Sequence, residues 1–238
     1  MNIIREIESR AIRAMPATET FRIEEWIGSL GRGAVGRLNS VTTFGTVPYD
    51  LFASVESVEH RYRNRSREVS FRLTELDAEL DDLLWARGYE KSIEVSVMST
   101  DQCVGLLDPE VTIRRAVTAG WVDDYKTLNA CSELRASEIR ESLSALDRDH
   151  ALFSIETKAI GLAVYDSGWV GIFDVVVDND SRRRGLGTRI VQTALAWGSE
   201  LGAEHAYLQV VSSNTPAICL YQSLGFTEAY RYWYQRRD

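Results

Sequence analysis

Residues 182–188 read Arg-Arg-Arg-Gly-Leu-Gly-Thr, and they stand between an apolar, strand-like run over 171–177 and a helical pattern that begins near Leu186. Glycine lets the backbone turn tightly and brings bare N–H groups close to a ligand. The first N–H groups of a helix have no partner within the helix, and the positive end of its dipole favours anions. Neighbouring arginines add charge-assisted hydrogen bonds. The stretch therefore predicts a cradle for a phosphate-bearing ligand.

Spacing decides which kind of phosphate loop this is. No Gly-x-x-x-x-Gly-Lys-Ser/Thr occurs in the chain, and the dinucleotide pattern needs a third glycine where Ile190 stands. The pattern that matches is Arg/Gln-x-x-Gly-x-Gly/Ala, with Arg182, Gly185 and Gly187. It resembles the pyrophosphate loop of the GCN5-related N-acetyltransferases. Taken alone, an ordinary basic helix start with a glycine turn explains the same residues.

A second segment, farther along the chain, resembles the same family. After a strand pattern over 205–211, residues 212–226 read Ser-Ser-Asn-Thr-Pro-Ala-Ile-Cys-Leu-Tyr-Gln-Ser-Leu-Gly-Phe. They predict one short helix, because Asn214 or the threonine after it can cap the start, the proline suits the first helical position, and Gly225 suits the residue past the end. The resemblance implies that Asn214 lies near the cofactor and Tyr221 near its thioester sulfur.

The family resemblance implies acetyl-CoA as co-substrate and no metal. Backbone groups around Val175 and Val177, on a strand that splays from its neighbour, would meet the pantetheine arm, and Asn214 would reach the cofactor from the other side of the splay. The pyrophosphate would be held by the loop residues Arg182, Arg183, Arg184, Gly185, Leu186, Gly187 and Thr188.

The implied reaction is transfer of an acetyl group to a primary amine of a small molecule or peptide, by direct attack on the thioester. Proximity of the bound reactants supplies much of the acceleration. Tyr221 is the candidate acid for the departing thiolate, against the alternative of a core tyrosine. Asp174 is the candidate base, although strand alternation turns it away from the two cofactor-facing valines unless a bulge intervenes. A structural carboxylate is the alternative reading of Asp174, and Glu156, Asp166 or a water chain are alternative bases.

Two other function classes stay open on the sequence. A non-catalytic acyl-CoA sensor would bind the cofactor without needing Tyr221, and a protein-interaction module would not bind CoA at all. The intact loop over 182–188 argues against the second of these.

Composition restricts the partners more than the chemistry. The formal net charge of −8 over 238 residues argues against a nucleic-acid binder and would suit a cationic amine, although acidity also favours solubility. Three cysteines and three histidines show neither a disulfide framework nor metal-ligand spacing. Residues 1–15 form an amphipathic helical pattern rather than a secretory signal, and no apolar run approaches membrane-spanning length. We expect a cytoplasmic enzyme, monomeric or homodimeric, without nucleic-acid or membrane partners.

The order of patterns predicts an α/β (α+β) protein with the acyl-CoA N-acyltransferase fold, a mixed central sheet flanked by helices. The complete half, 109–238, runs as a strand near 111, helices over 122–132 and 137–146, strands over 151–156, 159–165 and 171–177, a helix over 186–201, and a final strand over 227–236 after the segments quoted above. The first half, 1–108, reads as a degenerate echo without a phosphate loop, as in tandem members of the family. Its patterns are strands at 21–26, 35–44, 68–73 and 93–98 and helices at 49–61 and 76–86.

The acceptor pocket is the least determined part of the site. We expect the first half to be structural or to wall this pocket, with Gly31, Gly33 and Gly36 forming a turn. Candidate lining residues, each with a packing, capping or solvated alternative, are Trp121, Asp123, Asp124 and Tyr125 on one side, Trp26 or Arg37 on the other, and one ring of the row Tyr230, Tyr232 and Tyr234.

Overall fold

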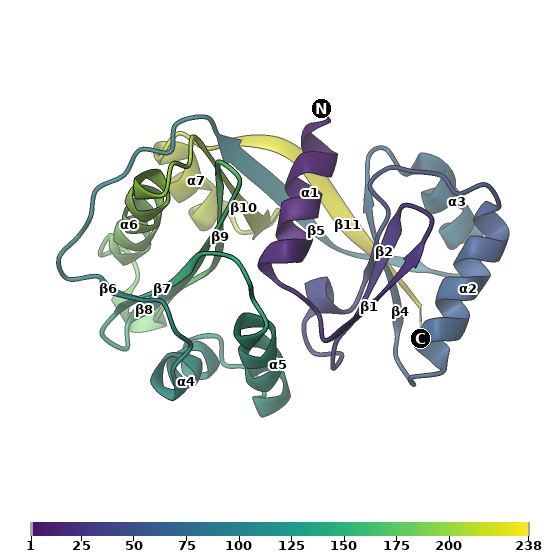
Figure 1. Ribbon diagram of the computed structural model, residues 1–238, viewed down its shortest axis with the longest axis horizontal. Helices are drawn as coiled ribbons and strands as arrows, with labels where there is room; N and C mark the ends of the chain where they lie inside the picture. Colours follow the sequence, from purple (N-terminus) through teal and green to yellow (C-terminus); the bar gives the residue numbers. More distant parts are fainter. Residues whose placement is uncertain (1, 238) are drawn as a thin grey trace.

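A computed structural model describes residues 2–237, and one mixed sheet of eleven strands runs through them in the order β1-β2-β3-β4-β11-β5-β10-β9-β8-β7-β6. Helices lie against both ends of this sheet, and the long strands β5 and β11 cross from one end to the other (Figure 1). The expected α/β fold is confirmed.

The N-terminal range contributes the end of the sheet at the right of Figure 1. Its elements are α1 Ile3–Ala14, β1 Glu19–Ile23, β2 Trp26–Leu30, the 3-10 helix η1 Gly36–Leu38, β3 Val41–Thr42, α2 Leu51–Arg63, β4 Val69–Thr74, α3 Ala78–Ala86 and β5 Glu90–Thr100. The single strand expected over 21–26 is wrong. The chain instead turns at Glu24, whose φ of 50° is left-handed, and β1 and β2 form an antiparallel hairpin.

The strand expected over 35–44 is also wrong, because a distant carboxylate takes up the backbone of the loop before it. Glu138 is 1% exposed and accepts backbone N–H bonds from Arg32 (2.7 Å), Ala34 (2.9 Å) and Val35 (2.8 Å). The Asn39 amide adds a fourth bond to the same carboxylate at 2.7 Å. The loop 31–36 is therefore a turn, as its glycines indicated, and only η1 and the two-residue β3 follow it.

Replacing Glu138 by alanine should lower the free energy of unfolding by about 3 kcal/mol, since it leaves several loop N–H groups without their charged acceptor. Urea unfolding followed by circular dichroism measures this. The control is Glu141→Ala on the same helix, whose contact with Arg32 is a partly exposed ion pair and is worth about 1 kcal/mol at most. Equal effects of the two substitutions would contradict the importance of the buried carboxylate.

The C-terminal range contributes the other end of the sheet. Its elements are β6 Thr112–Arg114, α4 Ala119–Leu128, α5 Glu133–Ser144, β7 His150–Ile155, β8 Ala159–Asp166, β9 Trp169–Val177, the 3-10 helix η2 Asn179–Ser181, α6 Leu186–Glu200, β10 His205–Val211, α7 Thr215–Ser223 and β11 Thr227–Arg237. Helices α4 and α5 begin earlier than the patterns at 122 and 137 indicated. Thr118 and Ser132 cap them there by accepting the backbone N–H of Trp121 and Arg135.

The middle of the sheet joins strands from both ranges. Strand β5 lies between β10 and β11 and is antiparallel to both, and β11 continues alongside β4. We retain the division into 1–108 and 109–238 as a proposal. The proposed boundary falls in the segment between β5 and β6, and the strand pairing crosses it.

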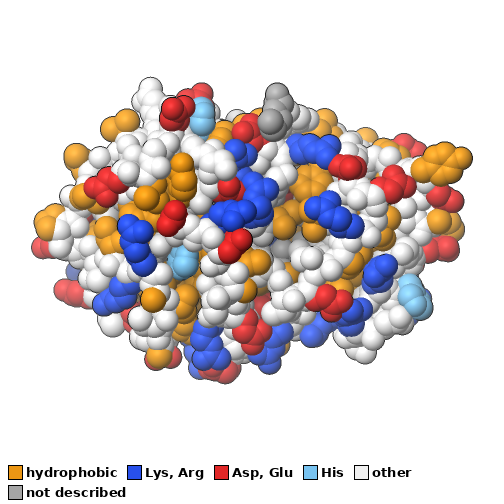
Figure 2. Space-filling view, in the orientation of Figure 1, with side chains coloured by type: hydrophobic (Ala, Val, Ile, Leu, Met, Phe, Trp, Pro, Cys, Tyr) orange, Lys and Arg blue, Asp and Glu red, His pale blue; other side chains and the backbone are white. Residues whose placement is uncertain are grey.

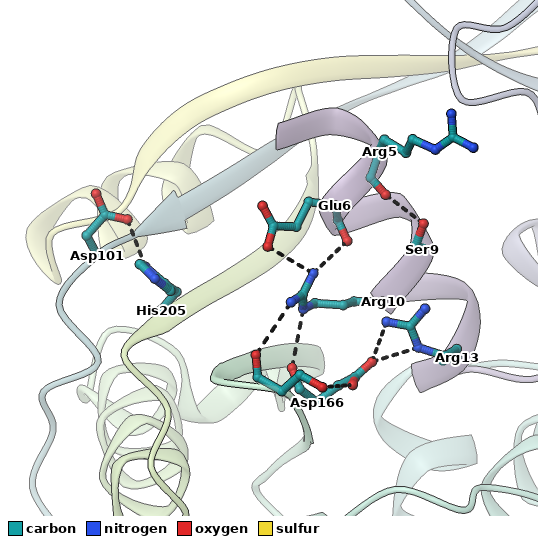
Figure 3. A network of polar contacts seen from close by, with 9 residues as sticks. Arg5, Glu6, Ser9, Arg10, Arg13, Asp101, Asp166 and His205 are labelled. Atoms are coloured by element: carbon teal, nitrogen blue, oxygen red, sulfur yellow. Dashed lines mark hydrogen bonds and ion pairs between the residues drawn. The ribbon is translucent and has the colours of Figure 1, made fainter. Parts of the chain in front are cut away.

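Helix α1 lies over the sheet between its two ends (Figure 1). Figure 3 shows how the helix is tied to the last residue of β8: Arg13 Nε donates to the Asp166 carboxylate at 2.7 Å, and Arg10 Nε donates to the Asp166 carbonyl at 3.3 Å. Burial acts to raise the pKa of Asp166, but the hydrogen bonds of Arg13 and Ser167 outweigh it and lower the pKa. Asp166 is thus an ionised anchor for α1.

A buried ion pair joins α1 to the middle of the sheet. One oxygen of Glu8 accepts from Arg72 Nη2 of β4 at 2.7 Å and from the Tyr230 hydroxyl of β11 at 2.6 Å. Glu8 is 1% exposed and Arg72 is 3% exposed. The Arg72 guanidinium also lies 3.8 Å from the centre of the Tyr232 ring. The three elements therefore share one charged contact inside the protein.

An apolar core packs around α2 and α3 and includes Trp26, Val55 and Leu84. Two further cores lie on opposite faces of the rest of the sheet. One core packs under α1, α4 and α5 and includes Phe173, Tyr207 and Tyr232, whereas the other packs under α6 and α7 and includes Ile172 and Leu208. Within residues 2–237, no helix combines the length and the apolar character needed to cross a membrane. The same residues contain no group of three His, Cys, Asp or Glu side chains able to hold a metal ion.

Candidate active site

Strands β9 and β10 run parallel and then separate. Their last paired residues are Ile172 and Leu208, yet β9 continues to Val177 alongside β8, and β10 continues to Val211 alongside β5. The splay expected from the sequence is therefore present. It leaves the backbone of residues 173–177 without a strand partner on the β10 side, and unpaired strand backbone can bind the amide groups of a ligand.

A bulge lies in this splayed part of β9. Phe173 pairs with Leu162 and Val176 pairs with Ile160, so that Asp174 and Val175 together oppose one residue of β8. Asp174 has a left-handed φ of 50°. Val175 and Val177 pack with the core under α6, whereas Phe173 and Val176 pack with the core under α4 and α5.

The bulge places the Asp174 carboxylate against Arg37 from the first half. Its Oδ1 accepts from Arg37 Nη2 at 2.9 Å, and its side chain is 8% exposed. No hydrogen-bond partner for the buried Oδ2 is found among residues 2–237. Burial acts to lower the pKa of Arg37, but the charge of Asp174 outweighs it, and the pKa is raised. One oxygen of Asp174 is thus held by a cation, and the other is buried without a hydrogen-bond partner in the described part of the chain.

The other two candidate bases lie elsewhere. Glu156 stands in the turn between β7 and β8, where it pairs with Lys158, and Asp166 anchors α1. Of the three carboxylates considered, Asp174 is the one on the splayed segment of β9.

The loop before α6 has the geometry that its glycines and arginines indicated. Gly185 caps the fifteen-residue helix with a φ of 76°, and Arg183 is also left-handed with a φ of 63°. The side chains of residues 182–184 are exposed, and Arg182 Nε reaches the Val177 carbonyl at 3.5 Å. The free N–H groups at the start of α6 and these arginines form one basic rim beside the end of β9.

Gly187 lets three elements approach one another at this rim. A Cβ there would lie 3.1 Å from Leu220 Cδ1 of α7 and 3.6 Å from Val177 Cγ2 of β9. A Cβ at Gly185 would instead meet no atom within 4 Å, so this residue faces open space. The start of α6 therefore lies against α7 and β9, whereas the surface at Gly185, just before the helix, is open.

Arg189 is a residue of this helix whose role the sequence did not indicate. Its guanidinium pairs with Asp108 at 2.5 Å and with Glu110 at 2.5 Å. Arg189 thereby ties the segment between β5 and β6 to the start of α6. The only sequence signal was an acidic pair far away in the chain, which no local pattern connects to α6.

Helix α7 brings Asn214 and Tyr221 to the other side of the splay. The Asn214 side chain caps the helix by accepting the Ala217 N–H at 3.3 Å. Tyr221 is 8% exposed, and its ring lies 6.2 Å from that of Phe226. Burial raises the pKa of Tyr221 to about 12. Within the described chain the Tyr221 hydroxyl has no hydrogen-bond partner, so its proton is held at neutral pH and not committed to another group.

A cleft of about 570 Å³ opens on the sheet face opposite α6, between the loop 31–36, α5 and the ends of β10 and β11. Arg37, Tyr232 and Tyr234 line it, as the sequence allowed. Trp26, Trp121 and Tyr125 are wrong as lining residues because they are fully packed in the cores, and Asp123 and Asp124 do not line the cleft either. Figure 2 shows basic, acidic and hydrophobic side chains interspersed on the face that carries α1.

A mixed sheet with a splayed parallel strand pair beside a helix-starting phosphate loop is the architecture of the GCN5-related N-acetyltransferases, and the chain has this fold. A GCN5-related N-acetyltransferase from Kribbella flavida superposes with a TM-score of 0.72 at 18% identity, over 99% of this chain and 96% of that one. A tandem protein of the same class from the clavulanic acid biosynthesis pathway gives a TM-score of 0.66 at 14% identity, over 97% and 87% of the two chains. At these identities the likeness shows the fold.

The sequence comparisons specify the family. The chain belongs to the family described as "Probable histone acetyltransferase Rv0428c C-terminal", whose profile matches residues 2–235. It is 26% identical to the uncharacterized N-acetyltransferase YobR of Bacillus subtilis, over 99% of both proteins. The protein is therefore an N-acetyltransferase, and enzymes of this fold use acetyl-CoA.

Proposed function

We propose that this enzyme transfers the acetyl group of acetyl-CoA to a primary amine of a small molecule or peptide, by direct attack of the amine on the thioester. The observation that carries the proposal is the loop 182–188, which opens α6 beside the splayed end of β9. We further propose that residues 109–238 bind the cofactor, that residues 1–108 wall the acceptor cleft, and that the enzyme works in the cytoplasm as a monomer or homodimer.

The residues present fit the cofactor in charge and in space. Diphosphate would be held by the N–H groups of residues 183–188, with Arg182, Arg183 and Arg184 closing over it, because these arginines are exposed and the surface at Gly185 is open. The unpaired backbone around Val175 and Val177 would bind the pantetheine amides, and Asn214 would approach from α7. Acetyl-CoA supplies the activated acyl group as a thioester.

Two side chains are proposed for the proton transfers. Tyr221 would donate its hydroxyl proton, or a hydrogen bond, to the departing thiolate. Asp174 would accept a proton from the attacking amine through its free Oδ2, while Arg37 holds the other oxygen. The bulge in β9, which sets Asp174 against Arg37, supports this proposal.

Replacing Tyr221 by phenylalanine should lower kcat about 100-fold or more while leaving acetyl-CoA binding unchanged, because it removes one proton donor without removing the ring. Release of CoA thiol with a panel of primary amines measures the rate, and calorimetry measures the affinity. A sensor that uses acetyl-CoA only as a ligand would show no turnover in either protein. Full activity in the variant would exclude Tyr221 as the acid.

The pH dependence offers a separate check on Tyr221. Because burial raises its pKa to about 12, the phenol stays protonated across the working range. The rate of the wild type should therefore show no loss attributable to this proton between pH 7 and about pH 11. If the wild-type rate instead falls within that pH range, and the fall is absent from Tyr221→Phe, then the pKa of Tyr221 is far lower.

A further inference from the structure

The cleft has a charge opposite to that of the chain. Its lining holds five arginines and one acidic residue, Glu68, although the net charge of the protein is −8. The arginines are Arg32, Arg37, Arg67, Arg135 and Arg236. The net negative charge of the chain suggested a cationic amine as substrate, but the surface of this cleft is positively charged.

Three of the five arginines have no carboxylate partner among residues 2–237. Arg37 is paired with Asp174, and Arg32 is paired with Glu141 at 2.9 Å. Arg135 makes one side-chain bond, from its Nε to the Tyr125 hydroxyl at 3.3 Å. Arg67 and Arg236 have no ion pair in this part of the chain. These three guanidinium groups therefore lie at the cleft without a direct ion pair to any carboxylate of the described residues.

Two of these groups converge on the loop 31–36. A Cβ at Gly36 would lie 3.2 Å from Arg236 Nη2, and a Cβ at Gly33 would lie 3.1 Å from Arg67 Nη1. The absence of side chains at these glycines thus lets both guanidinium groups lie against one short loop. Because Glu138 binds the backbone of this loop, the surface against which the two guanidinium groups lie is held in place.

The cleft also contains buried donors without acceptors. Ser70 Oγ, Gln209 Nε2 and Arg236 Nε are each buried, line the cleft and have no hydrogen-bond partner within the described residues. Ser70 is 3% exposed. All three groups can donate, and the Gln209 oxygen is already used by the Tyr232 hydroxyl at 3.3 Å. A buried donor left without an acceptor is costly, and acceptor oxygens brought by a ligand would remove this cost.

The basic part of the cleft adjoins the proposed reaction centre. Gln209 and Val211 of the lining belong to β10 beyond its last pair with β9, and Arg37 holds Asp174 on the opposite edge of the splay. A molecule in this cleft can therefore present one end to the splay and the other to the arginines.

We propose that the acceptor carries an anionic group, a carboxylate or a phosphate, in addition to its amine, and that Arg67, Arg135 and Arg236 bind this group. This proposal rests on the proposed acetyl transfer and names the class of its substrate. Guanidinium groups bind both anions through paired charge-assisted hydrogen bonds. The buried donors supply further bonds to the same oxygens, and the amine is left to face the splay.

The test uses three pairs of amines that differ in the anion. They are 4-aminobutyrate with 4-aminobutanamide, glycylglycine with glycylglycinamide, and O-phosphoethanolamine with ethanolamine. Calorimetry measures the Kd of each amine for the enzyme saturated with CoA, so that binding is read without turnover. The proteins are the wild type, Arg236→Gln and Arg67→Gln. A further variant, Arg115→Gln, removes one exposed positive charge outside the cleft as a matched control.

At least one anionic amine should bind the wild type about tenfold or more tightly than its neutral partner, since charge-assisted hydrogen bonds are stronger than those between neutral groups. This preference should fall below about threefold in Arg236→Gln or Arg67→Gln and persist in Arg115→Gln. A preference in the first two pairs indicates a carboxylate, and one in the third indicates a phosphate. Equal binding within all three pairs, or a preference that survives both cleft substitutions, would overturn the proposal.

The outcome is separable from that of the acetyl-transfer proposal. Acetyl-CoA binding is measured independently for each protein by its thermal shift. If acetyl-CoA fails to bind the wild type, the cofactor proposal is wrong, whatever the amines do. If acetyl-CoA binds all variants and the anionic preference is absent, the acceptor class alone is wrong.

Discussion

With Gly185 and Gly187 both replaced by valine, acetyl-CoA should no longer raise the melting temperature, whereas the wild type should be stabilised by about 2.7 kcal/mol at a concentration 100 times the Kd. Gly185 has a φ of 76°, which a β-branched residue adopts only under strain, and its added side chain would fill the open surface of the loop. A side chain at Gly187 would press on the end of the Leu220 side chain and crowd the contact between α6 and α7.

The control separates loss of the site from loss of stability. Gly168, in the turn before β9, has a φ of 81° and no atom within 4 Å of its Cβ position, which closely matches Gly185. Gly168→Val should therefore lose stability much as Gly185→Val does, yet keep its full shift with acetyl-CoA. An undiminished shift in the double variant would move the cofactor away from this loop. If acetyl-CoA does not shift the melting temperature of the wild type, the cofactor proposal is wrong.

Replacing Glu8 by glutamine should lower the free energy of unfolding by about 3–5 kcal/mol, because Arg72 would remain buried without its counter-charge. Burial raises the pKa of Glu8 even though Arg72 and Tyr230 favour its charged form, so the pair is held in a poorly solvating environment. The measurement is urea unfolding of the wild type and the variant.

The control for this prediction is the double variant Glu8→Gln with Arg72→Met. It removes both charges and keeps the side-chain volumes similar, so it should regain most of the lost stability. A double variant that loses the sum of the two single effects would show that the two residues act independently. A loss below about 1 kcal/mol in Glu8→Gln alone would show that the contact contributes little.

The part of the fold that the sequence predicted best is the part set by local chemistry. Residues 205–211 form the strand expected, and α6 begins at Leu186 after a left-handed glycine, because the turn and the helix start are determined by adjacent residues. Asn214 caps α7 for the same reason. The resemblance to the GCN5-related class rested on two such segments, residues 182–188 and 212–226.

The first half was harder to predict from the sequence because some of its backbone N–H groups donate hydrogen bonds to distant residues. The loop 31–36 is bound by Glu138, which lies 106 positions from Arg32 in the sequence, so an apparent strand pattern became a turn and a 3-10 helix. The lining of the cleft was equally hard to predict from the sequence. Ser70, Gln209 and Arg236 come from three separate strands, and no spacing along the chain indicates that they meet. Periodicity also does not distinguish a pocket aromatic from a core one, as Trp26 and Tyr125 show.

The pairing of N-terminal with C-terminal strands in the middle of the sheet has a consequence for folding during synthesis. Strands β4 and β5 leave the ribosome long before β10 and β11, which pair with both edges of β5 and with one edge of β4. During synthesis they must wait with open edges for residues 205–237, and such long-range pairing is slow and exposes aggregation-prone surface. Conditions that slow translation of the last strands, or withhold chaperones, should therefore reduce the soluble yield more than the stability of the finished fold would indicate.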